Sequence, residues 1–253
     1  MRDHRPERRT ILTGLLGLTF TGVVSQQGWA AEDTPQRIMI FGDSQAQGLV
    51  GGALRLYRSD RGRKVLDKSK ISTGLMPRAN YDWPEQARGL AAGEHADVAV
   101  ALYGANDRPP VRVRGHVDSD LVAKFTDSYG ARVADISRSF REAGVPLVWV
   151  GHPIVKESVF AEDMALLNEI YAERSVAEGA IFLSTWDTFK GSDGQFSAYG
   201  RGCDGQTTRL RTDDGVHMSP AGYDVITAML MPYYDHYRRG AQPQAVVRGP
   251  AQG

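Results

Sequence analysis

The sequence predicts an α/β protein built around a parallel sheet. Short apolar runs, each long enough for one buried strand, alternate with longer segments that have helical spacing. Because strands separated by helices form βαβ units, the sheet is expected to be parallel, with right-handed crossovers. The length of 253 residues and an ordinary globular composition suit one sizeable domain. The four clearest strand candidates are residues 38–41, 97–103, 146–151 and 180–183.

The segments between these runs carry the caps and spacing of helices. In the longest of them, Leu121, Phe125 and Tyr129 recur at intervals of four, and Gly144 follows its end. Ser219 and Pro220 mark the start of the last helix, as cap and first-turn residue. The expected helices are residues 47–57, 82–90, 121–143, 161–178 and 219–237, with a possible short strand at 64–66 and a long polar loop at 184–215.

The first thirty residues have the pattern of an export signal. Four arginines precede an apolar stretch from Ile11 to Val24, and Gly28-Trp29-Ala30 supplies the small residues of a cleavage site. Arg8 and Arg9 resemble a twin-arginine signal, with an ordinary Sec signal or an uncleaved anchor as alternatives. We therefore expect a signal peptide at 1–30, a linker at 31–37, one folded domain at 38–239 and a disordered tail at 240–253.

Charge and cysteine content exclude several classes of function. The formal net charge is zero, whereas a nucleic-acid-binding protein normally has a basic surplus. The single cysteine, Cys203, rules out an internal disulfide and a cysteine-based zinc site. Histidine and acidic residues form no close cluster with metal-ligand spacing, so neither a metal nor another cofactor is expected.

Polar side chains follow two of the predicted strands and also lie shortly before the last helix. Ser44 comes directly after the first strand, Asn106 follows the second, and Asp214 and His217 precede the last helix. In a parallel sheet, ligands bind outside the carboxyl ends of the strands. A hydroxyl, a base, a group that orients the base and an amide donor are what acyl transfer to serine requires.

Each of these residues also has a structural interpretation when it is considered alone. Ser44 could cap a helix. His217 could be a structural loop histidine, Asn106 an Asx-turn residue, and Asp214 a solvated loop charge in competition with Asp213. Their order and placement together favour the catalytic interpretation.

Four blocks of the sequence resemble the SGNH (GDSL-type) hydrolases. They are Gly42-Asp43-Ser44, Gly74, Gly104-x-Asn106-Asp107 and Asp214-x-x-His217, and they occur in the order of that family. The segment from Trp186 to His217 also resembles an exported bacterial subgroup of unassigned function. The resemblance implies a flavodoxin-like three-layer sandwich of about five parallel strands and a carboxylic ester hydrolase activity.

The resemblance also implies a role for each matched residue. Ser44 would be the nucleophile, His217 the general base, and Asp214 the group that orients His217. The oxyanion hole would consist of the backbone N–H groups of Ser44 and Gly74 and the side-chain amide of Asn106. A glycine allows the close approach of a substrate to the backbone, and an amide is a donor that does not titrate. Ala46 stands where a G-x-S-x-G elbow needs glycine, which argues against an α/β-hydrolase lipase.

Other residues also have expected roles. Arg108 is a candidate contact for an anionic or polyol substrate, and His152 is a candidate cleft residue with a structural role as its alternative. Asp107 is expected to support its loop. Trp83 and Trp149 are expected to pack in the core.

The preferred function is an exported serine esterase that removes small acyl groups from carbohydrate. The polar loops around Ser44 and Asn106, with no long apolar stretch nearby, favour acetyl as the acyl group. The export signal favours location in the periplasm, or secretion, and no stable membrane anchor is expected. This location favours an envelope polysaccharide or exopolysaccharide as the substrate, with polysaccharide-synthesis machinery as a candidate partner. The alternatives are an O-acyltransferase that acetylates a sugar hydroxyl, a lipase or thioesterase, and a non-catalytic envelope binding module.

Overall fold

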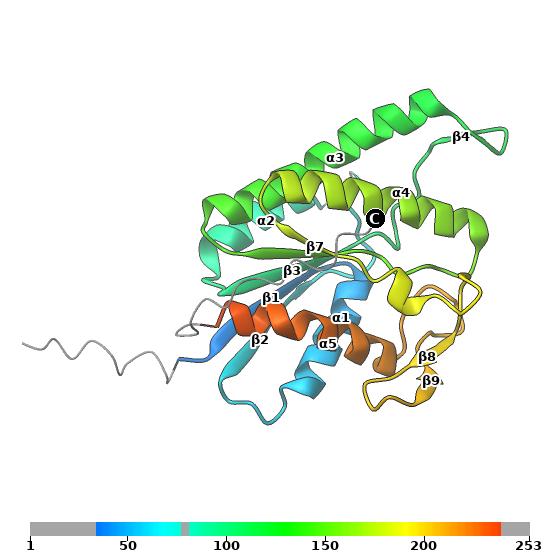
Figure 1. The fold of residues 1–253 in the computed structure, drawn as a ribbon. Coiled ribbons are helices and arrows are strands. Elements are labelled where there is room, and N and C mark those ends of the chain that lie inside the picture. Colours follow the sequence, from blue (N-terminus) through cyan, green and yellow to red (C-terminus); the bar gives the residue numbers. More distant parts are fainter. Residues whose placement is uncertain (1–33, 77–80, 239–253) are drawn as a thin grey trace, which may run out of the picture. The chain divides into compact units, whose positions relative to one another are not determined.

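A five-stranded parallel sheet forms the centre of the protein, as the sequence predicts. The computed structural model describes residues 34–76 and 81–238. The sheet has the strand order β2-β1-β3-β6-β7, and every neighbouring pair is parallel (Figure 1). Its strands are β1 (Gln36–Gly42), β2 (Arg63–Ser69), β3 (Val98–Leu102), β6 (Leu147–Val150) and β7 (Ile181–Leu183).

Helices cover both faces of this sheet and make the expected three-layer α/β sandwich. Figure 1 shows helices on both faces of the sheet. The first face carries α1 (Ser44–Leu56) and α5 (Pro220–His236), which pack against each other. The second carries α2 (Trp83–Gly93), α3 (Ser119–Glu142) and α4 (Ser158–Ala177).

The central strand β1 shows why the sheet is buried on both sides. Ile38 and Ile40 belong to the core under α1 and α5, whereas Met39 and Phe41 belong to the core under α2, α3 and α4. All four side chains are fully buried. Because successive side chains of a strand point to opposite faces, an unbroken apolar run is what a strand between two helical layers requires. Trp83 and Trp149 are also fully buried, so both pack in the core as expected.

The strand order places a topological switch point at β1 and β3. The chain leaves β1 for β2 on one side and later returns to β3 on the other side of β1. The loops after β1 and β3 therefore diverge at the carboxyl ends of neighbouring strands, which is where open α/β sheets bind their ligands.

Among the elements whose boundaries differ from the sequence prediction, β1 and α1 matter most because they flank Ser44. Strand β1 begins at Gln36 and so includes the end of the segment assigned as linker 31–37. Helix α1 begins at Ser44, earlier than the expected residue 47, because Asp43 caps it there.

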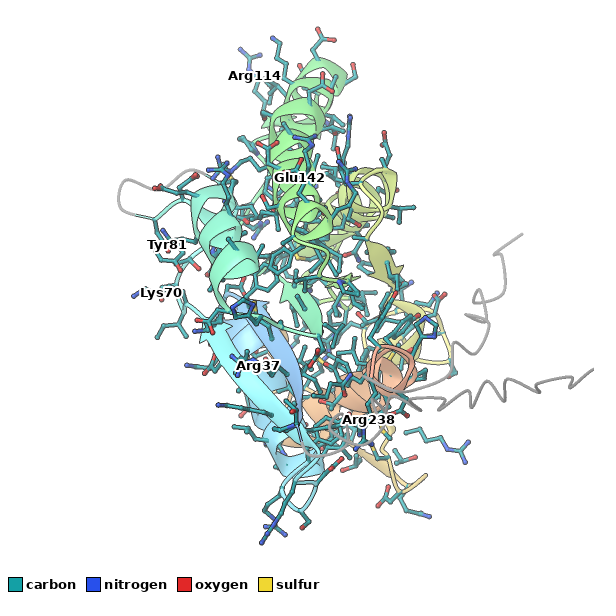
Figure 2. The ribbon with its side chains drawn as sticks, turned by 90° about the vertical axis from the view of Figure 1, so that its left-hand side faces the viewer. Arg37, Lys70, Tyr81, Arg114, Glu142 and Arg238 are labelled. Atoms are coloured by element: carbon teal, nitrogen blue, oxygen red, sulfur yellow. The ribbon has the colours of Figure 1, made fainter. Side chains whose placement is uncertain are left out.

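Short elements escaped the sequence prediction altogether. The hairpin of β4 (Arg112–Val113) and β5 (His116–Val117) precedes α3, and Figure 2 shows Arg114 at its tip, with Glu142 far down α3. The loop expected at 184–215 contains a 3₁₀ turn, η1 (Asp187–Phe189), and the hairpin of β8 (Tyr199–Arg201) and β9 (Thr207–Arg209). Strands of two or three residues are too short to show the alternation by which a strand is recognised.

The segments predicted to be an export signal (1–30) and a disordered tail (240–253) lie outside the described residues. Within residues 34–76 and 81–238, no helix is both long enough and apolar enough to span a membrane.

Candidate active site

The turn between β1 and α1 fixes the position of Ser44. Gly42 has φ +139°, and a Cβ at this position would lie 2.0 Å from the carbonyl oxygen of Leu102, so only glycine fits. Asp43 is the N-cap, and its Oδ1 accepts a hydrogen bond of 2.9 Å from the N–H of Gln45. Ser44 is the first residue of α1 and is half-buried. Its backbone N–H belongs to the first turn, whose N–H groups find no partner within the helix.

The structure brings Ser44, His217 and Asp214 into one hydrogen-bonded relay. Ser44 Oγ lies 2.9 Å from His217 Nε2. On the other side of the ring, His217 Nδ1 lies 2.7 Å from Asp214 Oδ2. A carboxylate can only accept, so Nδ1 carries a proton and Nε2 is left as the acceptor for the serine hydroxyl. This is the order of groups needed to remove a proton from Ser44.

The loop before α5 holds Asp214 in its ionised form. Its Oδ1 accepts hydrogen bonds from Thr212 Oγ1 at 2.6 Å, Val216 N at 2.8 Å and His217 N at 3.0 Å. Burial alone would raise the pKa of Asp214, but these bonds and the imidazole outweigh it and hold the pKa well below its ordinary value. Asp214 therefore keeps a negative charge facing the imidazole.

The two loops expected to supply oxyanion donors are bound to each other. Asn106 Nδ2 donates a hydrogen bond of 2.8 Å to the carbonyl oxygen of Thr73, so the amide lies beside Gly74. The carboxylate of Asp107 accepts from Leu75 N at 2.7 Å and from Met76 N at 3.2 Å. A Cβ on Gly74 would lie 2.1 Å from Asp107 Oδ1, so glycine is what lets the loop close over this carboxylate. Asp107 thus supports the loops, as the sequence suggested.

Comparison with known proteins places this site in a family. The sequence model of the family described as "Protein of unknown function (DUF459)" matches residues 37–233, which include every residue of the relay and both oxyanion loops. The chain belongs to the DUF459 family. A search of curated protein sequences gives no match.

Solved structures show that the DUF459 chain has the SGNH hydrolase fold. A candidate SGNH hydrolase from Slackia heliotrinireducens has a TM-score of 0.52 and 18% identity, over 79% of this chain and 98% of that one. The aryl esterase of M. smegmatis has a TM-score of 0.55 and 12% identity, over 78% and 97%. The periplasmic domain of a lipopolysaccharide acetyltransferase from Salmonella ser. Paratyphi A has a TM-score of 0.52 and 12% identity, over 80% and 85%.

Gln45 joins the nucleophile of the DUF459 chain to the loop of its base. Its side chain is buried, its Oε1 accepts a hydrogen bond of 2.9 Å from Tyr223 OH, and its Nε2 donates one of 3.3 Å to Val216 O. In the sequence, Gln45 is only one polar residue of the loop around Ser44. The one signal that could have identified it is its place directly after the nucleophile at the start of α1.

Arg211 is a second group that sequence reasoning missed. It is fully buried, donates to Val216 O at 3.1 Å and also to Ile154 O, and lies near the rings of Phe189 and Phe196. Burial lowers the pKa of its guanidinium to about 10. Arg211 ties the loop before α5 to the segment after β6, which gives the base loop a fixed anchor.

The two candidate substrate-binding residues have other contacts. His152 is fully buried, its Nδ1 bonds Pro153 O at 2.9 Å, and burial lowers its pKa to about 3, so it is a neutral structural group rather than a substrate contact. Arg108 donates to Asp163 Oδ2 at 2.7 Å and lies over the Phe160 ring, while about half of its side chain stays exposed. Arg108 can therefore contact a ligand only with a guanidinium that is already paired.

Asp43 lies beside the nucleophile but in a different electrostatic state from Asp214. Asp43 is fully buried, and desolvation raises its pKa to about 7. The hydrogen bond from the N–H of Gln45 lowers this pKa, whereas the nearby charge of Asp107 raises it further. The surroundings thus shift the pKa values of these two carboxyls in opposite directions, and Asp214 is the one that stays ionised. In the part of the chain that the structure describes, no group of three or more His, Cys, Asp or Glu side chains could hold a metal ion.

Proposed function

We propose that this protein is a serine ester hydrolase that works through an acyl-enzyme. The observation that carries the proposal is the relay from Ser44 Oγ through His217 to Asp214, with distances of 2.9 Å and 2.7 Å. A histidine whose Nδ1 is held by an ionised carboxylate presents a basic Nε2 to the hydroxyl, which is the arrangement that activates serine.

The reaction proceeds in two halves on these residues. Ser44 Oγ attacks the ester carbonyl carbon while His217 Nε2 takes the hydroxyl proton, and the developing oxyanion is stabilised by the N–H of Ser44, the N–H of Gly74 and the Asn106 amide. His217 then gives the proton to the leaving alcohol oxygen, which leaves an acyl group on Ser44. Water enters, loses a proton to His217 and releases the acid, and Ser44 recovers its proton.

The alcohol side of the ester is proposed to be a carbohydrate of the bacterial envelope or of exopolysaccharide, encountered after export to the periplasm. The support is the polar character of Gln47 and Arg108 near the site and the export-like N-terminus. Acetyl is the acyl group that these polar loops favour. A longer acyl group would require an apolar pocket beside the oxyanion loops.

Acyl transfer to a sugar hydroxyl is the second candidate function. It uses the same relay and differs only in the acceptor of the acyl group. The similarity of the fold to that of the Salmonella acetyltransferase domain supports this second candidate. Product analysis with a free sugar acceptor decides between them: an O-acyl sugar indicates transfer, and free acid alone indicates hydrolysis.

The proposed function is tested by comparing the wild-type protein with Ser44→Ala over esters of graded chain length and an acetylated polysaccharide. Hydrolysis by the wild type should fall by a factor on the order of 10⁵ or more in the variant. Equal and negligible rates for both proteins would point to a non-catalytic binding module instead.

A further inference from the structure

A buried carboxylate on α4, that of Asp163, binds two arginines of the segment that follows Asn106. The side chain of Asp163 is only 2% exposed. Its Oδ2 accepts a hydrogen bond of 2.7 Å from Arg108 Nε, and its Oδ1 accepts one from Arg112 Nη1. A buried ionised carboxylate is stable only when it is closely paired, so these two contacts belong together. Each oxygen of Asp163 therefore binds one end of the same short segment.

The segment between the two arginines is stiff. Pro109 and Pro110 have φ angles that their rings fix. Val111, which follows them, is buried, and its N–H donates a hydrogen bond of 2.9 Å to Pro109 O. Its carbonyl oxygen accepts one of 2.8 Å from the N–H of Asp118. Because the two ion pairs hold the two ends of a stiff segment, Asp163 fixes the direction of the segment as well as its position.

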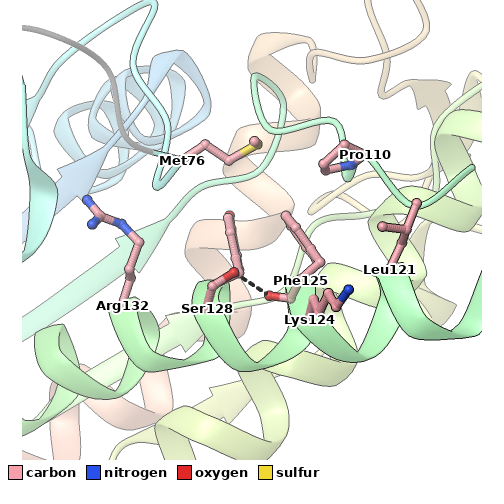
Figure 3. Close-up of a pocket in the computed structure, with 8 residues that line it drawn as sticks. Met76, Pro110, Leu121, Lys124, Phe125, Ser128 and Arg132 are labelled. Atoms are coloured by element: carbon pink, nitrogen blue, oxygen red, sulfur yellow. Dashed lines mark hydrogen bonds between the residues drawn. The ribbon is translucent and has the colours of Figure 1, made fainter.

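Against α3 the same segment is less closely held. Pro110 borders a pocket of about 450 Å³, and Figure 3 shows it facing α3 across this space. Among the described residues that line the pocket, none belongs to the relay or to the expected oxyanion donors. The ion pairs to α4 are therefore the polar contacts that set where this segment lies.

The side chain of Arg108 is held by several groups of α4 and its cap. Besides the pair with Asp163, its guanidinium carbon lies 4.3 Å from the centroid of the Phe160 ring. Its Nη2 lies 3.9 Å from Oε2 of Glu157, the N-cap of α4. The charge of Arg108 is thus used within the protein, beside the loop that carries Asn106.

Asn106 lies between two fixed points of its loop. On one side the loop leaves β3 in the centre of the sheet, and on the other side Arg108, two residues after Asn106, is held by Asp163. An oxyanion donor must be placed accurately, because a displacement of about 1 Å can cost about 100-fold in rate. The direction of the Asn106 amide therefore depends on the anchor at Arg108.

We propose that Asp163 is a positioning residue for the reaction, which holds the loop of Asn106 in place through Arg108 and Arg112. The inference rests on the proposed function and adds to it a residue of α4 that lies outside the relay. Because Asp163 acts through an oxyanion donor, it contributes to stabilising the transition state rather than to binding the ester. Nothing local in the sequence marks it, since it lies 55 residues from Arg108 in the chain.

A double-mutant cycle on kcat tests the role of Asp163. Asp163→Asn keeps the size of the side chain and removes its charge, so kcat should fall by about 10- to 100-fold while KM changes by less than about twofold. In an Asn106→Ala background the same substitution should change kcat by less than about twofold, because the group that it positions is gone. An equal loss of kcat in both backgrounds overturns the proposal.

Glu162→Gln serves as the control for this cycle. Glu162 is the neighbour of Asp163 on α4, its side chain is 64% exposed, and among the ion pairs of the described residues it pairs only with Arg112. Its kcat should equal that of the wild type. A loss of kcat as large as that of Asp163→Asn would overturn the specific role of the buried carboxylate.

Hydrogen exchange measures the anchor independently of catalysis. In Asp163→Asn the amides of Asp107 and Val111, whose hydrogen bonds lie within the anchored segment and its loop, should exchange about 10-fold faster than in the wild type. The amide of Val216, in the base loop, should exchange at the wild-type rate. Arg108→Gln removes one of the same ion pairs from a half-exposed position, and it replaces Asp163→Asn if thermal unfolding shows that variant to be destabilised.

The two measurements separate this inference from the proposed function. If the wild type hydrolyses no ester, the proposed function fails and exchange alone decides: faster exchange supports the anchor, and unchanged exchange overturns it. If the wild type hydrolyses esters, unchanged exchange or an unchanged kcat in Asp163→Asn overturns the positioning role and leaves the proposed function intact.

Discussion

At the scale of single residues, the chemistry of the site depends on the different pKa values of Asp43 and Asp214, the two carboxyls near Ser44. Asp43 is fully buried and its pKa is raised to about 7, whereas Asp214 is held ionised by hydrogen bonds from Thr212, Val216 and His217. Only an ionised carboxylate on Nδ1 both fixes the tautomer of His217 and stabilises the imidazolium that forms during attack. The difference between the two residues is therefore chemical as well as positional.

Asp214→Asn should lower kcat by a factor on the order of 10⁴, because an amide can hold the ring in the wrong tautomer and cannot balance the imidazolium charge. Steady-state ester hydrolysis measures the change. Asp213→Asn is the matched control. The carboxylate of Asp213 is 94% exposed, and among the ion pairs of the described residues it pairs only with Arg209, so the kcat of this variant should be unchanged. Equal losses in the two variants would contradict the assignment of Asp214.

At the scale of elements, the base loop is positioned by contacts from outside it. Gln45, at the start of α1, and Arg211, after β9, both donate to the carbonyl oxygen of Val216, the residue before His217. Arg211 also donates to Ile154 O in the segment after β6. The nucleophile and the base come from opposite ends of the chain, and these contacts keep their separation at hydrogen-bonding distance.

Arg211→Lys should lower the free energy of unfolding by about 2 kcal/mol, because an ammonium group cannot reproduce the paired donors of the buried guanidinium. The melting temperature should fall by about 5 °C. Misplacement of His217 should also lower kcat by up to about 100-fold. Arg209→Lys, an exposed arginine on β9, should change stability by less than about 0.5 kcal/mol. A melting temperature for Arg211→Lys no lower than that for Arg209→Lys would show that the anchor contributes little.

The sequence predicts the local features of this molecule better than its long-range contacts. The apolar strands β1, β3, β6 and β7, the helices and the residues of the relay follow from short apolar runs, local periodicity, caps and the order of short motifs. The contacts of Gln45 and Arg211 do not, because each joins segments that are far apart in the chain and nothing local marks them. His152 shows the same limit: its position at a strand end suggested the cleft, but only the packing around it reveals that it is fully buried.

At the scale of the whole molecule, two buried groups give stability opposite dependences on pH. The pKa of His152 is lowered to about 3, so the unfolded chain binds the extra proton below its ordinary value of 6.5 and stability falls as the pH drops through that window. The pKa of Asp43 is raised from 3.8 to about 7, so its contribution is present at low pH and is lost as the pH rises through 7. Between pH 4.5 and 6.5 the two effects oppose each other.

Removing Asp43 and removing His152 should therefore change the slope of unfolding free energy against pH in opposite directions. Urea unfolding between pH 4.5 and 6.5 should show stability rising with pH more steeply for Asp43→Asn than for the wild type, and less steeply for His152→Gln. Each titrating group can change the slope by at most about 1.4 kcal/mol per pH unit. Parallel profiles for all three proteins would mean that neither group titrates differently on folding.

Covalent trapping tests the central claim, that Ser44 is a nucleophile activated by His217. A fluorophosphonate reacts with an activated serine and leaves a stable adduct, which intact-protein mass spectrometry counts and peptide mapping locates. We predict one adduct on the wild-type protein, located at Ser44, together with loss of esterase activity, and no adduct on Ser44→Ala. An adduct on another residue, or full esterase activity in Ser44→Ala, would contradict the account.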